Sequence, residues 1–187
     1  MNEIVLAIDV MGGDFGPKAT IEGIAMASKI YPNVRFKLYG DETKSSDQLK
    51  KNSELNNFEF VHTTENIKSD DEPVNALRKL KKSSMRLGID SVRNSECHGF
   101  VSAGNTGALM AISKFVLRTI NGIDRPAIAG ILPTMKGQTV VLDLGANVDC
   151  SNDNLVQFAL MGDIFSKLVL GIKNPKIGLL NVGSEHI

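Results

Sequence analysis

Features that define several protein classes are scarce in this sequence of 187 residues. It has no tryptophan and only two cysteines, Cys97 and Cys150, and neither belongs to a Cys-x-x-Cys pair or has a histidine at metal-ligand spacing. This scarcity excludes a disulfide framework and is typical of a protein from a reducing compartment. A nucleophilic role for Cys150 is not expected either, because no histidine lies near it in the sequence.

An excess of charge of one sign is also absent, because 21 lysine and arginine residues balance 21 aspartate and glutamate residues. A neutral chain offers no overall attraction for nucleic acid, so we expect no nucleic-acid partner. No stretch supplies the ~20 consecutive apolar residues that a membrane-spanning helix needs. The segment before Asp9 is short and has no basic leader, so we expect no signal peptide and a cytoplasmic protein.

Two common nucleotide-binding motifs are missing as well. The sequence contains no Walker A motif, and no G-x-G-x-x-G follows the apolar runs that end at Ile8 and Val101. The hydrophobic fraction of 42% is ordinary for a globular protein, and a chain of this length can bury roughly 70% of its unfolded surface. A substantial core is therefore feasible without disulfides.

Apolar periodicity divides the chain into alternating strands and helices. The expected strands cover residues 4–9, 34–40, 58–62, 99–102, 126–133, 138–143 and 176–182, and the expected helices cover residues 17–30, 73–93, 107–117 and 155–170. Residues 41–57 are expected to be a polar connection, and the alternation in 34–40 suits a strand nearer an edge. Because only one hairpin, near Leu132 and Val141, interrupts the pattern, we predict an α/β fold with a mostly parallel sheet covered on both faces, in a single unit over residues 1–187.

The segment from Ala7 to Thr20 is the most informative part of the sequence. Its strand is expected to end at Asp9, and Gly12 and Gly13 then allow the backbone to come close to a ligand. A helix is expected to begin shortly afterwards with Lys18 in its first turn, and the free N–H groups of a helix start attract negative charge. This order of residues predicts an anion-binding site.

Two further polar clusters follow apolar strands in the same way. The first supplies backbone N–H groups, an amide and a hydroxyl at a helix start, which is typical of a phosphate nest rather than a metal site. It consists of Gly104, Asn105, Thr106 and Gly107. The second runs from Asp143 to Asp149 and includes Asn147. Because the carboxyl ends of parallel strands share one edge of a sheet, we expect the three clusters to converge on one oxyanion.

Each of these residues also has a purely structural explanation. The glycines of the first two clusters suit tight turns between a strand and a helix. Asp143 suits a helix cap or a strand end, and Asn147 suits a turn with a left-handed backbone. Lys18 suits a solvated helix position. A basic stretch further along the chain suits either an exposed helix face or a docking site for an acidic partner. That stretch contains Arg78, Lys79, Lys81 and Lys82.

Seven sequence blocks together carry a resemblance to a known family. In chain order they are DVMGGDFGP, DEPVNALRKLKKSSM, SAGNTGALMA, GIDRPAIAGILPT, LDLGANVDC, LVQFALMG and NPKIGLLNVGSE. From Ile4 to Glu185 the chain resembles the phosphate acyltransferase (PlsX) family of bacterial phospholipid synthesis. Members of that family continue well past the position of Glu185, so the resemblance covers their first half or somewhat more. Leu80 departs from the family pattern, where a basic residue is more usual.

The resemblance implies transfer of a fatty acyl group from acyl carrier protein to inorganic phosphate, which gives an acyl phosphate for glycerolipid assembly. It implies no metal and no cofactor. The implied fold is an α/β/α sandwich with two lobes, like that of isocitrate and isopropylmalate dehydrogenases. The implied assembly is a cytoplasmic homodimer that works at the inner face of the membrane. Because the match covers only part of such an enzyme, we expect this chain alone to be weakly active or inactive.

The resemblance also gives the candidate site residues distinct roles. Lys18 balances the charge of the phosphate. The residues that position the phosphate are Gly12, Gly13, Gly104, Asn105, Thr106 and Gly107. Asp9, Asp143 and Asn147 orient these groups or polarise the thioester, whose tetrahedral oxyanion needs fixed donors. The basic stretch at 78–82 docks the acidic acyl carrier protein.

Two other functions remain open from the sequence. An actin-like or sugar-kinase-like phosphotransferase is possible because AIDVMGG and VLDLGAN each place an aspartate after a strand and before a glycine. In that fold, however, the first loop joins two strands of a hairpin, whereas residues 17–30 are expected to be a helix. The other possibility is a non-catalytic fragment that only binds phosphate or acyl carrier protein.

Overall fold

A computed structural model gives the structure of the chain and describes residues 3–147 and 149–180. The chain divides into two compact units, residues 1–118 and 119–187. The expected α/β class is confirmed, because parallel strands alternate with helices through the first unit. The expectation of a single unit over the whole chain stays a prediction.

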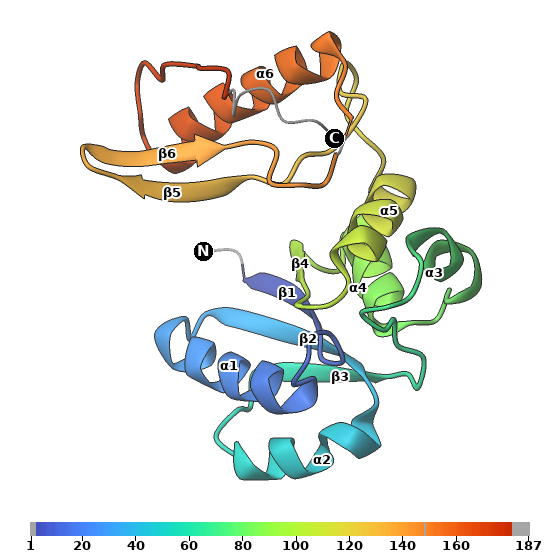
Figure 1. Cartoon of the computed structure of the whole chain (residues 1–187). Coiled ribbons are helices and arrows are strands. Elements are labelled where there is room, and N and C mark those ends of the chain that lie inside the picture. The colour runs from blue at the N-terminus through green and yellow to red at the C-terminus, as the bar shows by residue number, and fades with distance from the viewer. Residues whose placement is uncertain (1–2, 148, 181–187) are drawn as a thin grey trace. The chain divides into compact units, whose positions relative to one another are not determined.

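A four-stranded parallel sheet forms the centre of the first unit (Figure 1). Its strands are β1 (Ile4–Asp9), β2 (Val34–Gly40), β3 (Phe58–His62) and β4 (Gly99–Val101), in the order β3-β2-β1-β4. β2 is therefore an internal strand and not an edge strand. Its alternation reflects two different faces, because buried Phe36 and Leu38 lie on one face while Lys37, on the other, forms ion pairs with Glu96 and Glu59.

Both faces of this sheet are covered, as the sequence predicted. One core cluster joins Ile8 of β1 and Leu38 of β2 to Ile21 and Ile24 of helix α1 (Pro17–Ile30). On the opposite face, a second cluster contains Ala7 and Tyr39 with two residues of helix α4 (Ser84–Arg93), Leu87 and Val92. Neighbouring residues of β1 thus enter different cores, which explains why the strand reads as a continuous apolar run.

The helix expected over residues 73–93 is wrong in its length, because two helices occupy this range. They are α3 (Pro73–Lys79) and α4 (Ser84–Arg93). Ser83 separates the two helices. Its hydroxyl donates to the Leu80 carbonyl and accepts the backbone N–H of Arg86, in the first turn of α4. The apolar residues continue across this break because both helices pack on α5 (Thr106–Leu117) in one core, so periodicity alone did not reveal the break.

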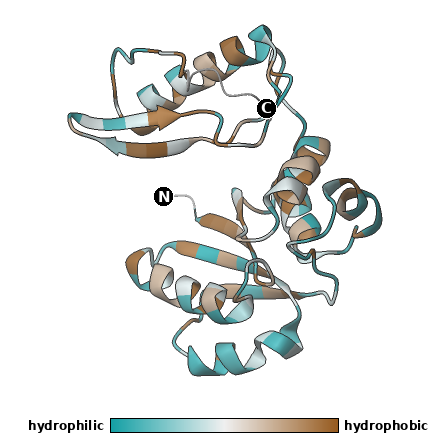
Figure 2. Ribbon diagram, viewed as in Figure 1, coloured by the Kyte–Doolittle hydropathy of each residue, from teal (hydrophilic) through white to brown (hydrophobic). Residues whose placement is uncertain are grey.

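A helix also stands where a polar connection was expected. Helix α2 (Glu42–Lys51) follows β2 directly, and Asp41 caps it by accepting the backbone N–H groups of Thr43 and Lys44. Figure 2 shows α2 as mostly hydrophilic, and only Leu49 packs against the first core cluster. Sequence reasoning missed this helix because Leu49 is its only large apolar residue, so the segment has almost no apolar periodicity.

The second unit contains the expected hairpin and one long helix. Strands β5 (Gly130–Thr134) and β6 (Gly137–Val141) pair antiparallel in a sheet of their own, and α6 (Asn152–Val169) begins at a capping box formed by Ser151 and Asn154. The strand expected over residues 176–182 is wrong for its described part, because residues 176–180 form no regular element. Residues 181 and 182 lie outside the described range. Within that range, no helix combines the length and the hydrophobicity needed to cross a bilayer.

Candidate anion-binding site

Asp9 lies at the end of β1, as predicted, and its side chain is almost completely buried. One carboxylate oxygen, Oδ1, accepts the Ser84 hydroxyl at 2.7 Å and the Met11 backbone N–H at 3.1 Å. The other, Oδ2, accepts the Ser102 hydroxyl at 2.8 Å. Asp9 therefore joins the end of β1 to the start of α4 and to the loop after β4.

The glycine loops after β1 and β4 lie in direct contact. A Cβ atom added to Gly12 would be 2.8 Å from the Gly104 backbone nitrogen and 2.8 Å from the Asp9 carboxylate. A Cβ atom on Gly104 would come within 3.3 Å of the Gly12 Cα atom. Gly13 has a φ of 84°, a left-handed value that favours glycine. The first two predicted clusters are therefore brought together at one edge of the parallel sheet.

Asn105 caps helix α5 and also binds a distant loop. Its Oδ1 atom accepts the Ala108 backbone N–H at 2.9 Å. Its Nδ2 atom lies 2.9 Å from the Asp71 carbonyl, 3.1 Å from the Ser69 carbonyl and 3.2 Å from the Lys68 carbonyl. An amide nitrogen has two hydrogens, so these contacts use all its donors. The side chain therefore positions the helix start and the loop at 68–71.

Several donors near this contact have no acceptor among the described residues. The backbone N–H groups of Asn105, Thr106 and Gly107 form no recorded hydrogen bond in this part of the chain. Such groups are expected at the first turn of a helix, where the dipole favours an anion. Thr106 is exposed, and Lys18 is exposed in the first turn of α1. The start of α5 thus presents backbone N–H groups and a hydroxyl of the kind that bind an oxyanion.

Asp143 and Asn147 belong to the second unit, where they bind each other. The Asp143 carboxylate accepts the backbone N–H of Asn147 at 2.6 Å and that of Ile128 at 2.8 Å. The Asn147 amide also donates to the Pro126 carbonyl at 3.0 Å. Burial raises the pKa of Asp143, but the hydrogen bonds to Ile128 and Asn147 outweigh it and hold the pKa below its usual value.

The third cluster therefore follows a strand of the hairpin, not a strand of the parallel sheet. The sequence argument for a common sheet edge does not extend to it, because β6 pairs with β5 in a separate sheet within the described residues. Its participation in one site with the first two clusters stays a prediction.

The predicted basic stretch lies at the end of α3 and in the connection to α4. All four of its cations are exposed, and none has a recorded ion pair within the described residues: Arg78, Lys79, Lys81 and Lys82. The backbone of Lys82 is fixed, because its carbonyl accepts the Thr63 hydroxyl at 2.6 Å and its N–H donates to Glu65 at 3.1 Å. The stretch is thus an exposed cationic surface whose backbone is anchored at Lys82.

Sequence reasoning missed Ser84 and the loop at 68–71 as parts of this region. Both lie far along the chain from the residues that they contact, with separations of 75 positions for Ser84 and Asp9 and of 34 to 37 for the loop and Asn105. A serine after a lysine-rich stretch carries no signal of such a contact. Only the three-dimensional path of α4 brings Ser84 to the end of β1.

Comparison with known proteins agrees with the resemblance found in the sequence. The chain matches the family described as fatty acid synthesis protein over residues 4–187. It is 50% identical over 185 residues to a phosphate acyltransferase of Paramagnetospirillum magneticum, which covers 98% of this chain and 53% of the relative. A phosphate acyltransferase of Magnetococcus marinus is 51% identical over 181 residues, covering 96% of this chain and 52% of the relative.

A third relative, the phosphate acyltransferase of Wolbachia pipientis subsp. Culex pipiens, is 46% identical over 191 aligned positions, covering 100% of this chain and 55% of the relative. The chain thus spans about half the length of the curated relatives that it matches. Because the family match extends over nearly all of the sequence, the chain belongs to the fatty acid synthesis protein family.

Proposed function

We propose that this protein takes part in the transfer of a fatty acyl group from acyl carrier protein to inorganic phosphate, for phospholipid synthesis. Family membership and relatives named phosphate acyltransferase support this reaction. The observation that carries the proposal is the contact between Gly12 and Gly104, which places two glycine loops beside the open N–H groups of α5. In this proposal the described first unit binds the phosphate.

The phosphate dianion lies at the start of α5 in this proposal. Backbone N–H groups of Asn105, Thr106 and Gly107 donate to its oxygens, and the Thr106 hydroxyl adds a further donor. Each charge-assisted hydrogen bond contributes about 1.5–3 kcal/mol, so three or four are enough to hold a dianion. Gly12 and Gly13 let the loop after β1 pack closely against residues 102–104 beside the helix start. Lys18 balances the charge of the anion. Asp9 and the Asn105 side chain act as positioning groups.

The chemistry requires mainly correct placement of two reactants. Phosphate is nucleophilic as a dianion, so one of its oxygens attacks the thioester carbonyl without a metal or cofactor. The tetrahedral oxyanion then collapses, the carbon–sulfur bond breaks, and the thiolate of the carrier leaves as acyl phosphate forms. Asp143 is a carboxylate at neutral pH, as an ordinary aspartate is, and its lowered pKa favours that form further. It therefore suits an orienting role with Asn147 better than the role of proton donor.

The proposal extends to the partners and the location of the protein. Acyl carrier protein is the acyl donor, and the exposed cations at 78–82 offer it a complementary surface. We propose a homodimer in the cytoplasm that associates peripherally with the inner face of the membrane, as the resemblance implies. The balanced charge of the chain is compatible with self-association and gives no reason to expect nucleic-acid binding.

The connection between β1 and β2 argues against the kinase-like alternative. The first loop of the actin-like and sugar-kinase-like folds joins two antiparallel strands of a hairpin. Here β1 leads into helix α1, and β1 and β2 pair in parallel from Ile4 and Val34 to Asp9 and Tyr39. The aspartate and glycines after β1 therefore belong to a strand-to-helix turn.

The experiment that tests the proposal is an assay of acyl phosphate formation from an acylated carrier protein and phosphate. Lys18→Ala and Asn105→Ala, made in a full-length family member at the matching positions and in this chain, should raise the phosphate concentration needed for half-maximal binding or rate by about tenfold. The matched control is Lys29→Ala, which removes an exposed lysine from the other end of α1. Unchanged phosphate dependence in both variants would remove these residues from the site.

The same assay separates the enzyme from a fragment that only binds. Phosphate binding by this chain without turnover would support a binding role for the first unit alone. ATP hydrolysis without phosphate-dependent acyl transfer would favour the kinase-like alternative instead.

A further inference from the structure

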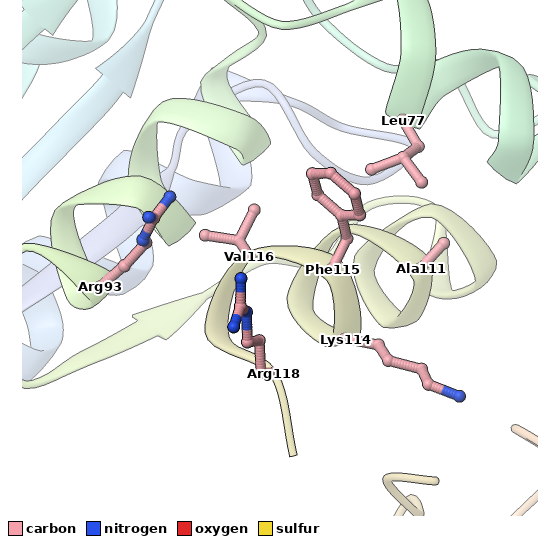
Figure 3. A pocket seen from close by; sticks show the side chains of 7 residues that line it. All are labelled: Leu77, Arg93, Ala111, Lys114, Phe115, Val116 and Arg118. Carbon is pink, nitrogen blue, oxygen red and sulfur yellow. The ribbon is translucent and has the colours of Figure 1, made fainter. Parts of the chain in front are cut away.

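A second surface of the first unit has the composition of a docking groove. Helices α3, α4 and α5 border an open hollow of about 660 Å³ whose lining residues are all apolar or cationic (Figure 3). The apolar lining is Leu77, Ala111, Phe115 and Val116, and the cations are Arg93, Lys114 and Arg118. No carboxylate lines the hollow, so its charge is of one sign only.

The three cations of this groove are free to bind an anionic partner. Arg93, Lys114 and Arg118 form no ion pair recorded among residues 3–147 and 149–180. All three lie near the carboxyl ends of α4 and α5, where the helix dipole favours positive charge. The dipole explains why cations are tolerated there. It does not explain the apolar surface between them.

Phe115 is the feature that points to a partner. Its side chain is 63% exposed, although α5 buries its other face through Ala108, Ile112 and Val116. The Arg86 guanidinium lies 5.9 Å from the centre of the Phe115 ring, and Arg86 is held in turn by Asp90 at 2.9 Å. Figure 3 shows the Phe115 and Leu77 side chains converging across the groove. An aromatic ring on a helix that is exposed to solvent and contacts an arginine is typical of a protein–protein interface.

We propose that the groove between α3 and α5 docks an acidic amphipathic helix of a protein partner. The apolar side chains of that helix would contact Phe115 and Leu77, and its carboxylates would pair with Arg93, Lys114 and Arg118. The hollow is open and rimmed by cations, which suits the face of a helix. The acidic partner to try first is acyl carrier protein, and this choice rests on the proposed function. The groove thereby becomes a docking surface distinct from the stretch at 78–82.

Binding of purified acyl carrier protein to this chain tests the proposal without any need for catalysis. Lys114→Glu combined with Arg118→Glu should raise the dissociation constant at least about tenfold at low salt, and the effect should shrink as salt rises. Phe115→Ser should also weaken binding about tenfold, but with little salt dependence, since it removes apolar contact. The two variants thus distinguish the electrostatic contribution to binding from the apolar contribution of Phe115.

Matched controls distinguish the groove from other basic surfaces. Lys50→Glu combined with Lys51→Glu makes the same charge change in the last turn of α2 and should leave binding unchanged. A triple charge reversal at Lys79, Lys81 and Lys82 tests the neighbouring stretch. If this triple variant loses binding while the groove variants bind normally, the groove proposal is overturned.

A measurement on the unaltered chain guards against variants that fail to fold. Addition of the carrier protein should slow amide hydrogen exchange in α3 and in the carboxyl-terminal turns of α4 and α5. Protection elsewhere, or binding of the groove to phosphatidylglycerol vesicles with no binding of the carrier, would overturn the proposal. A full-length family member that binds the carrier through the matching groove but forms no acyl phosphate would contradict the proposed function and leave the groove proposal intact.

Discussion

Asp9 ends a strand and Asp143 follows one, but the hydrogen-bond partners of the two aspartates lie at very different separations along the chain. The side-chain partners of Asp9, Ser84 and Ser102, lie 75 and 93 positions away, and Asp9 as a residue is 3% exposed. Asp143 is only partly buried and binds backbone groups 15 and 4 positions away. One aspartate therefore joins three elements of the first unit, whereas the other shapes a local turn in the second.

The difference shows that similar sequence patterns do not predict similar roles. DVMGG and DLGAN both place an aspartate before glycine after an apolar run. What separates them is the set of elements that packs around each one, a parallel sheet with α4 at Asp9 and a hairpin loop at Asp143. We expect the two regions to respond differently to the same substitution.

The largest expected difference comes from alanine at each aspartate. Asp9→Ala leaves two serine hydroxyls without their acceptor in a buried region, so we expect a loss of about 3 kcal/mol in the free energy of unfolding. Asp143→Ala should cost about 1 kcal/mol, because water can reach its partners. Urea unfolding of both variants measures the difference. Equal losses would show that the Asp9 contacts do not connect the elements as described.

A smaller difference is expected from alanine at the glycines of the two loops. Gly12→Ala would force a methyl group within 2.9 Å of Asp9, Ser102 and the Gly104 backbone, which should destabilise the chain by about 2 kcal/mol. Gly145 has open space around it but a φ of 106°, so Gly145→Ala should cost about 1 kcal/mol through backbone strain alone.

Thermal unfolding of the two glycine variants sharpens this comparison. Ser102→Ala removes the Oγ atom that crowds Gly12, but it also removes the hydrogen bonds of that atom with Asp9 and Gly104. The two changes combined should therefore cost less stability than the sum of their separate costs, whereas no side-chain change should rescue Gly145→Ala. Additive costs would mean that crowding by the Gly104 backbone dominates at Gly12.

The smallest effect is the pH dependence of the Asp143 turn. Because the pKa of Asp143 is lowered in the folded chain, its carboxylate adds stability that is present above its unfolded pKa of about 3.9 and is lost as pH falls through the folded value. Asp143→Asn should be less stable than the unaltered chain at pH 7. The gap should narrow below about pH 4, where Asp143 also becomes protonated.

Measuring unfolding of both proteins across this acid range isolates Asp143 from other carboxyls, such as Asp41 and Glu96, whose pKa values are also lowered. A gap that stays constant down to pH about 2.5 would contradict the assigned hydrogen bonds.

The sequence predicted those elements whose signals are local. The apolar run of β1, the proline that starts α1, the glycines before α5 and the turn between β5 and β6 each mark an element boundary. Helix α2 was missed because a side-chain cap at Asp41 replaces apolar periodicity as its start signal. The break between α3 and α4 was missed because both helices contribute to one core, and so the apolar pattern continues through Leu80.

The candidate site was predictable in its residues but not in its connections. Glycines, an asparagine and an aspartate at strand ends pointed to the loops that meet at Gly12 and Gly104. The contacts of Asp9 with Ser84 and of Asn105 with the loop at 68–71 depend on packing between distant elements. Polar contacts of this kind have no periodic signature, so a single sequence does not reveal them.

The Asn105 amide makes this region sensitive to a chemical change of a single group. Hydrolysis of the side-chain amide by water, with release of ammonia, would replace a donor with a carboxylate oxygen opposite the carbonyls of Lys68, Ser69 and Asp71. The remaining oxygen would still accept the Ala108 N–H, and carboxylates are good helix caps. Deamidation of Asn105 would therefore release the loop at 68–71 while leaving the start of α5 capped. New protease cleavage near residue 70 would reveal the change.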